Sequence, residues 1–168
     1  LTLTVGPERV GLVGRNGSGK STLLAIVAGA REPSSGVVAV SGRIGVLQQE
    51  WPDETITLAE ALGVAKHVAR LHRLEAGEGS GGDHDLADWT LDQRIADAFR
   101  DTGMDKPDLS RTITTFSGGE RTRIALVRLI LVAPDILLLD EPTNNLDADG
   151  RGQIAGLLKR WRGAALVA

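Results

Sequence analysis

The chain has 168 residues, 42% of them apolar, which is enough to build the core of one domain. Its formal net charge of -3 argues against bulk, sequence-independent binding of nucleic acid, which usually requires a strongly basic surface. The chain contains no cysteine, which excludes a disulfide framework and a thiolate metal site. No stretch approaches the roughly 20 apolar residues of a membrane span, and the first residues do not form a signal peptide. We therefore expect a soluble, cytoplasmic protein.

Both ends of the chain fall inside predicted strands. Leu1 begins in a strand-like stretch that leads to residues 10–13, and Ala168 stops within the apolar run 164–168. Because a domain seldom ends within a core strand, we expect the natural polypeptide to extend beyond both ends.

The first third of the chain predicts a strand, a glycine-rich loop and a helix. Residues 10–13 form a short apolar run, and residues 20–30 continue as an apolar-rich helix. After a turn at residues 33–36, we predict two strands at residues 37–40 and 43–47, separated by a serine and a glycine. These two strands would form an antiparallel portion of the fold.

The middle of the chain predicts helices. Residues 57–74 have apolar side chains at helical spacing, and Thr57 and Glu60 are placed to form a capping box at the start. We therefore expect one continuous helix here.

An acidic stretch follows this helix. Residues 77–85 are rich in glycine and predict a flexible segment. A second helix is predicted from Thr90, with Gln93 as its capping partner, to about Asp101. Residues 75–110 carry ten acidic and three basic side chains, a net charge of -7, which makes this the least basic part of the chain.

A phosphate-binding motif lies between the first predicted strand and helix. Residues 14–21, with the sequence GRNGSGKS, match the P-loop pattern without a gap and in the context that the motif requires. Glycines allow the backbone angles of the loop and the close approach of its amides to phosphate oxygens, and the helix N-terminus adds partial positive charge. Lys20 would supply a charge for the β and γ phosphates, and Ser21 a hydroxyl for Mg²⁺. The expected nucleotide-binding residues are Gly14, Asn16, Gly17, Ser18, Gly19, Lys20, Ser21 and Thr22.

Two carboxylates end the apolar run at residues 136–139. Such a run is typical of a buried parallel strand, and ligands sit at the carboxyl ends of such strands. Consecutive side chains at a strand end point in different directions, so Asp140 and Glu141 can have separate roles. We expect Asp140 to hold Mg²⁺ through its water shell and Glu141 to orient or deprotonate the attacking water.

A second glycine motif, SGGE, occupies residues 117–120. It predicts the start of a helix, with Ser117 as the N-cap and Glu120 reaching back to it, and two glycines at a helix N-terminus also form an anion site. The order P-loop, SGGE and Asp-Glu after an apolar strand resembles the ATP-binding cassette (ABC) superfamily. In that family the signature contacts the γ-phosphate of ATP held by the opposite cassette of a head-to-tail dimer. The resemblance implies that Ser117, Gly118 and Gly119 act in trans, and it adds Glu120 to the nucleotide-binding residues.

The resemblance also assigns two further loops. Gln49, in the sequence VLQQEW, occupies the place of the Q-loop glutamine, which links the γ-phosphate and Mg²⁺ to a mobile helical region. This implies catalytic and metal-binding roles for Gln49. Its neighbour Gln48 is the less suitable candidate, and a polar residue at a strand end is the alternative interpretation. Residues 144–147 match the D-loop, which makes Asp147 a nucleotide-binding candidate.

Two short strings, DEPTNNLD and RIGVLQQE, are similar to the F subfamily of ABC proteins, and the acidic insert is similar to that of their first cassette. Asn145 stands where that subfamily usually has histidine. F-type proteins are soluble twin-cassette ATPases that act on ribosomes. The resemblance implies ATP and Mg²⁺ as ligands, ATP hydrolysis with a second cassette in the same chain or in a homodimer, and the ribosome as partner. It also implies a P-loop α/β core at residues 1–56 and 116–168, with an antiparallel β portion, and a helical subdomain at residues 57–115.

Two alternatives remain open. One is the ATP-binding subunit of a membrane transporter, which would dock a transmembrane subunit near Gln49 and the helical segment without itself inserting into the membrane. The other is a nucleotide-binding piece without turnover, because the resemblance places the switch histidine and the adenine-stacking aromatic outside residues 1–168.

Overall fold

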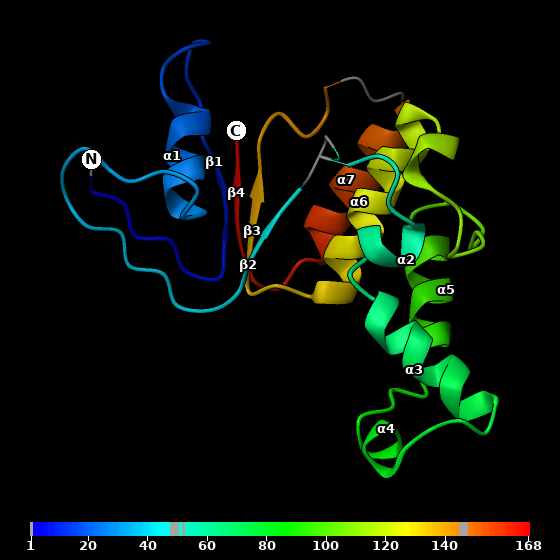
Figure 1. Cartoon of the computed structure of the whole chain (residues 1–168). Helices are drawn as coiled ribbons and strands as arrows, with labels where there is room; N and C mark the ends of the chain where they lie inside the picture. The colour runs from blue at the N-terminus through cyan, green and yellow to red at the C-terminus, as the bar shows by residue number, and fades with distance from the viewer. Residues whose placement is uncertain (1, 48–50, 52, 145–147) are drawn as a thin grey trace. The chain divides into compact units, whose positions relative to one another are not determined.

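The computed structural model describes residues 2–47, 51, 53–144 and 148–168, and the chain divides into two compact units. The first unit comprises residues 1–48 and 132–168, and the second comprises residues 49–131. A sheet with its helices forms the first unit, whereas the second is built from helices (Figure 1).

The sheet of the first unit has four strands in the order β1-β4-β3-β2, and every pairing among them is parallel. The strands are β1 (Arg9–Gly11), β2 (Ile44–Val46), β3 (Ile136–Leu139) and β4 (Ala164–Val167). The two central strands, β3 and β4, are largely buried, as their apolar runs predict. Because the strands are parallel, the carboxyl ends of β1 and β3 lie at the same edge of the sheet.

Among its described residues, this unit contains two helices, α1 (Lys20–Val27) and α7 (Ala148–Arg160). Leu24 of α1 packs with Leu138 of β3 and Leu166 of β4 in a buried cluster. This contact holds α1 against the central strands and so positions the loop between β1 and α1.

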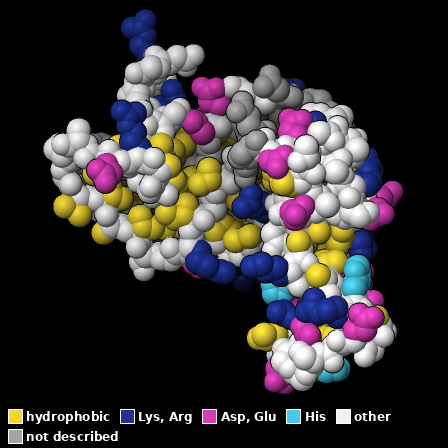
Figure 2. All heavy atoms as spheres, in the orientation of Figure 1, with side chains coloured by type: hydrophobic (Ala, Val, Ile, Leu, Met, Phe, Trp, Pro, Cys, Tyr) yellow, Lys and Arg dark blue, Asp and Glu magenta, His cyan; other side chains and the backbone are white. Residues whose placement is uncertain are grey.

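The predicted antiparallel portion at residues 37–47 is wrong. Residues 37–40 form no strand, and β2 pairs with β3 in parallel register. Apolar side chains lie open on the surface of the first unit (Figure 2), and the exposed large ones include Val37, Val38 and Val40.

Gly42 explains why the serine–glycine pair is not a hairpin turn. It has a φ of 110°, and the next residue, Arg43, donates its backbone N–H to the Asp135 carboxylate at 2.7 Å. The Asp135 backbone N–H donates in turn to the Arg43 carbonyl at 2.9 Å. These bonds hold β2 beside the start of β3, and a Cβ on Gly42 would lie only 2.8 Å from the Asp135 Cβ. The partner lies some ninety residues away, where no local pattern could indicate it.

The second unit contains five α-helices and one short 3₁₀ helix among its described residues. They are α2 (Leu58–Ala61), α3 (Ala65–Glu75), α4 (Gly81–Asp85), α5 (Leu91–Asp101), η1 (Ile113–Thr115) and α6 (Gly118–Val132). The core of this unit contains fully buried side chains from α2, α5 and α6, including Leu58, Ile95, Phe99 and Ile124.

The single helix expected at residues 57–74 is two helices. Gly63, between α2 and α3, has a φ of 75°, which ends the first helix because left-handed angles cannot continue it. The capping box is confirmed: the Glu60 N–H donates to the Thr57 hydroxyl at 3.2 Å, and the Thr57 N–H donates to the Glu60 carboxylate at 2.7 Å.

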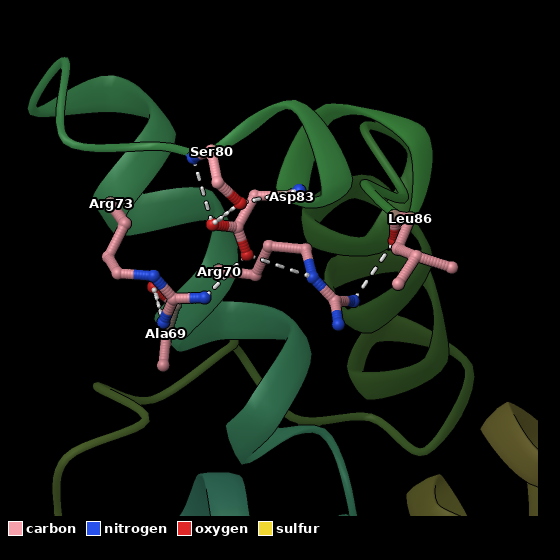
Figure 3. A network of polar contacts seen from close by, with 6 residues as sticks. All are labelled: Ala69, Arg70, Arg73, Ser80, Asp83 and Leu86. Atoms are coloured by element: carbon pink, nitrogen blue, oxygen red, sulfur yellow. Dashed lines mark hydrogen bonds and ion pairs between the residues drawn. The ribbon is translucent and has the colours of Figure 1, made fainter.

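The segment expected to be flexible contains the helix α4. Ser80 and Asp83 form a capping box at its start, and Arg73 of α3 donates to the Asp83 carboxylate at 2.6 Å (Figure 3). Arg70 also pairs with Asp83 at 3.5 Å and donates to the Leu86 carbonyl at 3.0 Å. The hydrogen bonds that Asp83 accepts hold its pKa well below its usual range; the bond from Arg73 has the largest effect, and those from Ser80 come next.

The second predicted helix is confirmed as α5, but its predicted capping partner is wrong. The Thr90 side chain makes no capping bond. The Thr90 backbone N–H and side-chain hydroxyl both donate to the Asp88 carboxylate, at 3.1 and 2.7 Å. Gln93 instead donates to Asp97, one turn along, at 2.9 Å.

Within the described part of the chain, no helix is both long and apolar enough to cross a membrane.

Candidate nucleotide-binding site

The loop that joins β1 to α1 has the backbone that its glycines predict. Gly17 and Gly19 have φ angles of 80° and 93°, which side chains disfavour. A Cβ on Gly14 would lie 2.6 Å from the Ser18 hydroxyl oxygen, so a larger residue there would require the Ser18 side chain to move. The Ser18 N–H closes the loop on the Arg15 carbonyl at 3.0 Å. The backbone angles therefore give a physical reason for glycine at Gly17 and Gly19.

Lys20 is the first residue of α1, and its side chain folds back over the loop. The Nζ atom donates to the carbonyls of Gly14 at 3.1 Å and Arg15 at 3.4 Å. Both acceptors are neutral, and among the described residues no carboxylate forms an ion pair with this lysine. Its positive charge is therefore free to balance an anion at the helix N-terminus.

A cavity of about 280 Å³ lies at this loop. Its lining residues are Asn16, Gly17, Gly19, Lys20, Ser21, Thr22 and Glu141. The structure thus brings Glu141 to six of the predicted loop residues, although it lies about 120 positions further along the chain. Gly14 and Ser18 belong to the loop itself but do not line the cavity, and neither does Asp140.

The carboxylates follow β3 at the edge where β1 also ends. Glu141 has a φ of 42°, and its N–H donates to the Ala168 carbonyl at 3.0 Å. Its own carbonyl accepts from the Asn144 N–H at 3.0 Å, and its carboxylate accepts from the Asn144 side chain. The chain therefore turns sharply straight after Asp140, and this turn places Glu141 at the cavity.

The side chains at this edge also suit Mg²⁺. Magnesium prefers oxygen ligands and usually takes only one or two carboxylates from the protein, with phosphates and water completing its shell. Ser21 lines the cavity with a hydroxyl, and Asp140 supplies a partly buried carboxylate next to Glu141. Across the residues that the structure describes, no cluster of three or more His, Cys, Asp and Glu side chains is placed to hold a metal ion. The donor set therefore fits a cation that arrives with a phosphate ligand.

The SGGE motif lies in the second unit, where it begins α6. The Ser117 N–H and hydroxyl donate to the Glu120 carboxylate at 2.8 and 2.7 Å, which confirms the predicted helix start. These two bonds hold the pKa of Glu120 below its usual range, and the bond from the Ser117 hydroxyl has the larger effect. Gly118 and Gly119 are exposed, and a Cβ on either would meet no described atom within 4 Å. Packing within the described chain therefore gives no reason for glycine at these two positions.

Two arginines that the sequence analysis did not select support this motif. Arg121 donates its Nε to the Phe116 carbonyl at 3.0 Å and pairs with Glu54 at 2.6 Å. The Arg111 guanidinium lies 4.2 Å from the centre of the Phe116 ring. No sequence signal could indicate the pair of Arg121 with Glu54, because 67 positions separate them.

The family model described as ABC transporter matches residues 1–144. The chain belongs to the ABC transporter family. The match confirms the resemblance to ABC proteins and the P-loop fold that the sequence predicted. The sheet of this fold is parallel where we expected an antiparallel portion. The expected Q-loop glutamine of this ABC cassette, Gln49, and the D-loop residue Asp147 lie outside the described residues.

Individual ABC relatives support the similarity to F-type cassettes. The chain is 38% identical to the energy-dependent translational throttle protein EttA of Mycobacterium tuberculosis, over 99% of this chain and 34% of that protein. It is 33% identical to ABC transporter F family member 5 of Arabidopsis thaliana, over 91% of this chain and 26% of that protein. The chain therefore spans only about a quarter to a third of these relatives.

A solved structure shares the same fold. It is a model of ribosome-bound archaeal Pelota and ABCE1, with a TM-score of 0.67 and 26% identity over 98% of this chain and 25% of that chain. The ABC family assignment supports ATP binding and, in intact proteins of the family, ATPase activity.

Proposed function

We propose that this chain is an ATP-binding cassette that holds Mg-ATP at the cavity beside Lys20 and, in the intact protein, hydrolyses it together with a second cassette. The observation that carries this proposal is the cavity itself. It joins the glycine-rich loop, the Lys20 ammonium, the Ser21 hydroxyl and the Glu141 carboxylate in one small space. These groups supply a phosphate cradle, a charge, a metal ligand and a base.

Each of these residues has a separate task in phosphoryl transfer, where positioning and charge neutralisation provide most of the catalysis. The loop amides and Lys20 bind phosphate oxygens, and Lys20 is already oriented by its bonds to two loop carbonyls. Ser21 and Asp140 would hold Mg²⁺, which supplies charge neutralisation on the phosphates when it is bound. Glu141 orients or deprotonates the attacking water.

The second cassette would complete the site through the signature motif. Gly118 and Gly119 are exposed at the start of a 15-residue helix, and no described atom of this chain explains their lack of side chains. Glycine there suits the close approach of a group from outside the chain, and a helix N-terminus suits an anion. We propose that Ser117, Gly118 and Gly119 contact ATP held by the opposite cassette, with Glu120 fixing the turn. Gln49 and Asp147 keep the nucleotide-site roles that the family resemblance implies.

The intact protein would act in the cytoplasm on the ribosome. A relative named as a translational throttle protein and a structural match in a ribosome-bound assembly support this role. The alternative is the ATP-binding subunit of a transporter, with the same ATP chemistry and a membrane partner. Sedimentation of the tagged full-length protein separates these roles: cosedimentation with ribosomes in the presence of ATP supports the proposal, whereas recovery with membranes overturns it.

ATP binding by the full-length protein tests the site. Lys20→Ala should reduce ATP affinity by at least about 10-fold, because it removes the cationic ligand of the phosphates. Lys66→Ala, on an exposed position of α3, is the matched control and should leave ATP affinity unchanged. Unchanged affinity in Lys20→Ala would sink the P-loop assignment.

A further inference from the structure

Asn144 holds the carboxylate that we propose as the general base. Its side-chain Nδ2 donates to Oε2 of Glu141, and its backbone N–H donates to the Glu141 carbonyl at 3.0 Å. On the other side of the turn, the Glu141 N–H donates to the Ala168 carbonyl at 3.0 Å. Glu141 is thus held at its N–H, at its carbonyl and at one carboxylate oxygen.

The backbone at Glu141 needs this support. Its φ of 42° lies in the left-handed region, which is unfavourable for a residue with a side chain. Such a conformation persists only where the surrounding structure imposes it, and it is often found at functional sites. Here the strained turn follows β3 directly, and it presents Glu141 to the cavity that contains Lys20 and Ser21.

The side chain of Asn144 does more than form the turn. The backbone N–H of any residue except proline could close the turn on the Glu141 carbonyl. The amide side chain adds a donor to the carboxylate itself. It fixes one carboxylate oxygen of Glu141, and a neutral amide N–H does not compete as a base.

We propose that Asn144 is a positioning residue for Glu141, one that fixes the orientation of its carboxylate at the edge of the phosphate cavity. This inference rests on the proposed function, because it requires Glu141 to act on the attacking water. Within the described residues, Glu141 is the one cavity-lining residue to which Asn144 forms a hydrogen bond, so loss of Asn144 should affect turnover and not ATP affinity.

The test uses the full-length protein. If a second cassette in the same chain provides another ATP site, the glutamate of that site is replaced by glutamine, so that the measured turnover comes from the site that contains Glu141. Asn144→Ala should slow ATP turnover by about 10- to 100-fold, the loss expected when a reacting group is misplaced by about 1 Å. The dissociation constant for ATP should change by less than about 2-fold, since the phosphate ligands are intact. Asn144→Asp, which keeps the size of the side chain but replaces the donor with a carboxylate, should slow turnover at least as much.

Gln93→Glu is the matched control for Asn144→Asp. Gln93 also donates its amide to a carboxylate, that of Asp97, at 2.9 Å, but it does so on α5 in the second unit. The same change from amide to carboxylate at this position should leave turnover unchanged.

A double variant identifies the route of the effect. If Asn144 acts through Glu141, then Asn144→Ala combined with Glu141→Gln should be no slower than Glu141→Gln alone. A further loss in the double variant, normal turnover in Asn144→Ala, or a parallel loss of ATP affinity would each overturn the inference. If Glu141→Gln loses turnover but Asn144→Ala keeps normal turnover, the role of Asn144 is refuted and that of Glu141 is not. Normal turnover in Glu141→Gln refutes the proposed base and the inference with it.

Discussion

Arg121, in the first turn of the signature helix α6, forms an ion pair at 2.6 Å with Glu54, which lies just after the expected Q-loop. Backbone bonds reinforce this link: the Thr114 N–H donates to the Glu54 carbonyl, and the Ile113 N–H donates to the Ile56 carbonyl, both at 3.0 Å. The segment that follows the Q-loop and the segment that leads into SGGE are therefore joined within the second unit.

Replacing Arg121 should loosen the start of α6. Arg121→Ala removes the pair with Glu54 and the bond to the Phe116 carbonyl, and its side chain is only 23% exposed. We expect the free energy of unfolding to fall by about 1–2 kcal/mol, because a partly buried carbonyl loses its donor. Urea denaturation measures this loss. Arg162→Ala, at an exposed position, is the control and should change stability little. Equal stability of the two variants would show that the pair contributes nothing.

Glu141→Gln should separate binding from turnover. The change keeps the size of the side chain but removes the base, so we expect ATP turnover to fall by about 10²-fold or more, with ATP affinity retained. A filter-binding assay and a phosphate-release assay on the full-length protein measure the two quantities. Steady hydrolysis by this variant would refute the role of Glu141.

The α4 segment should be sensitive to acid. Because its bonds lower the pKa of Asp83 from 3.8, Asp83 stabilises α4 fully above that pH, and this contribution is lost as the pH falls further and the carboxylate takes up a proton. We expect the amides of residues 81–85 to exchange faster in Asp83→Asn than in the unmodified protein at pH 6. The two proteins should become similar as the pH falls well below 3.8.

Asp85→Asn is the matched control for this experiment. It makes the same change on the same helix, at an exposed side chain. We expect normal amide exchange in Asp85→Asn. Equally fast exchange in both variants would attribute the effect to the lost charge rather than to the bonds from Arg73 and Ser80.

Gly163, just before β4, should tolerate no side chain. A Cβ there would lie 2.2 Å from the Asp135 carbonyl oxygen, so the backbone at the start of β3 would have to move. We expect Gly163→Ala to lower the free energy of unfolding by more than about 2 kcal/mol, as overpacking of a core does. In Gly152→Ala, within α7, the Cβ would meet no described atom within 4 Å, and this control should be neutral or stabilising. Thermal unfolding compares the two; equal midpoints would contradict the prediction.

Local patterns predicted well the elements whose cause is local. The P-loop between β1 and α1, the apolar strand β3 and the start of α6 at Ser117 each follow from neighbouring residues in the sequence. Patterns failed where a distant partner decides. The valines at residues 37–40 were expected to pair as a hairpin strand, but β2 pairs with β3 instead, since Asp135 binds the backbone beside Gly42.

The same distinction applies to the site. The sequence by itself predicted the chemistry, because a glycine-rich loop with a lysine suits phosphate, and an acidic pair after an apolar strand suits Mg²⁺, for reasons that are local to each motif. Only the tertiary structure decided that Glu141 lies at the cavity of the loop and that Asn144 holds its carboxylate. The physical reason is that β1 and β3 both pair in parallel with β4, which brings their ends to one edge of the sheet, and the β1 residues lie 156 positions from their β4 partners.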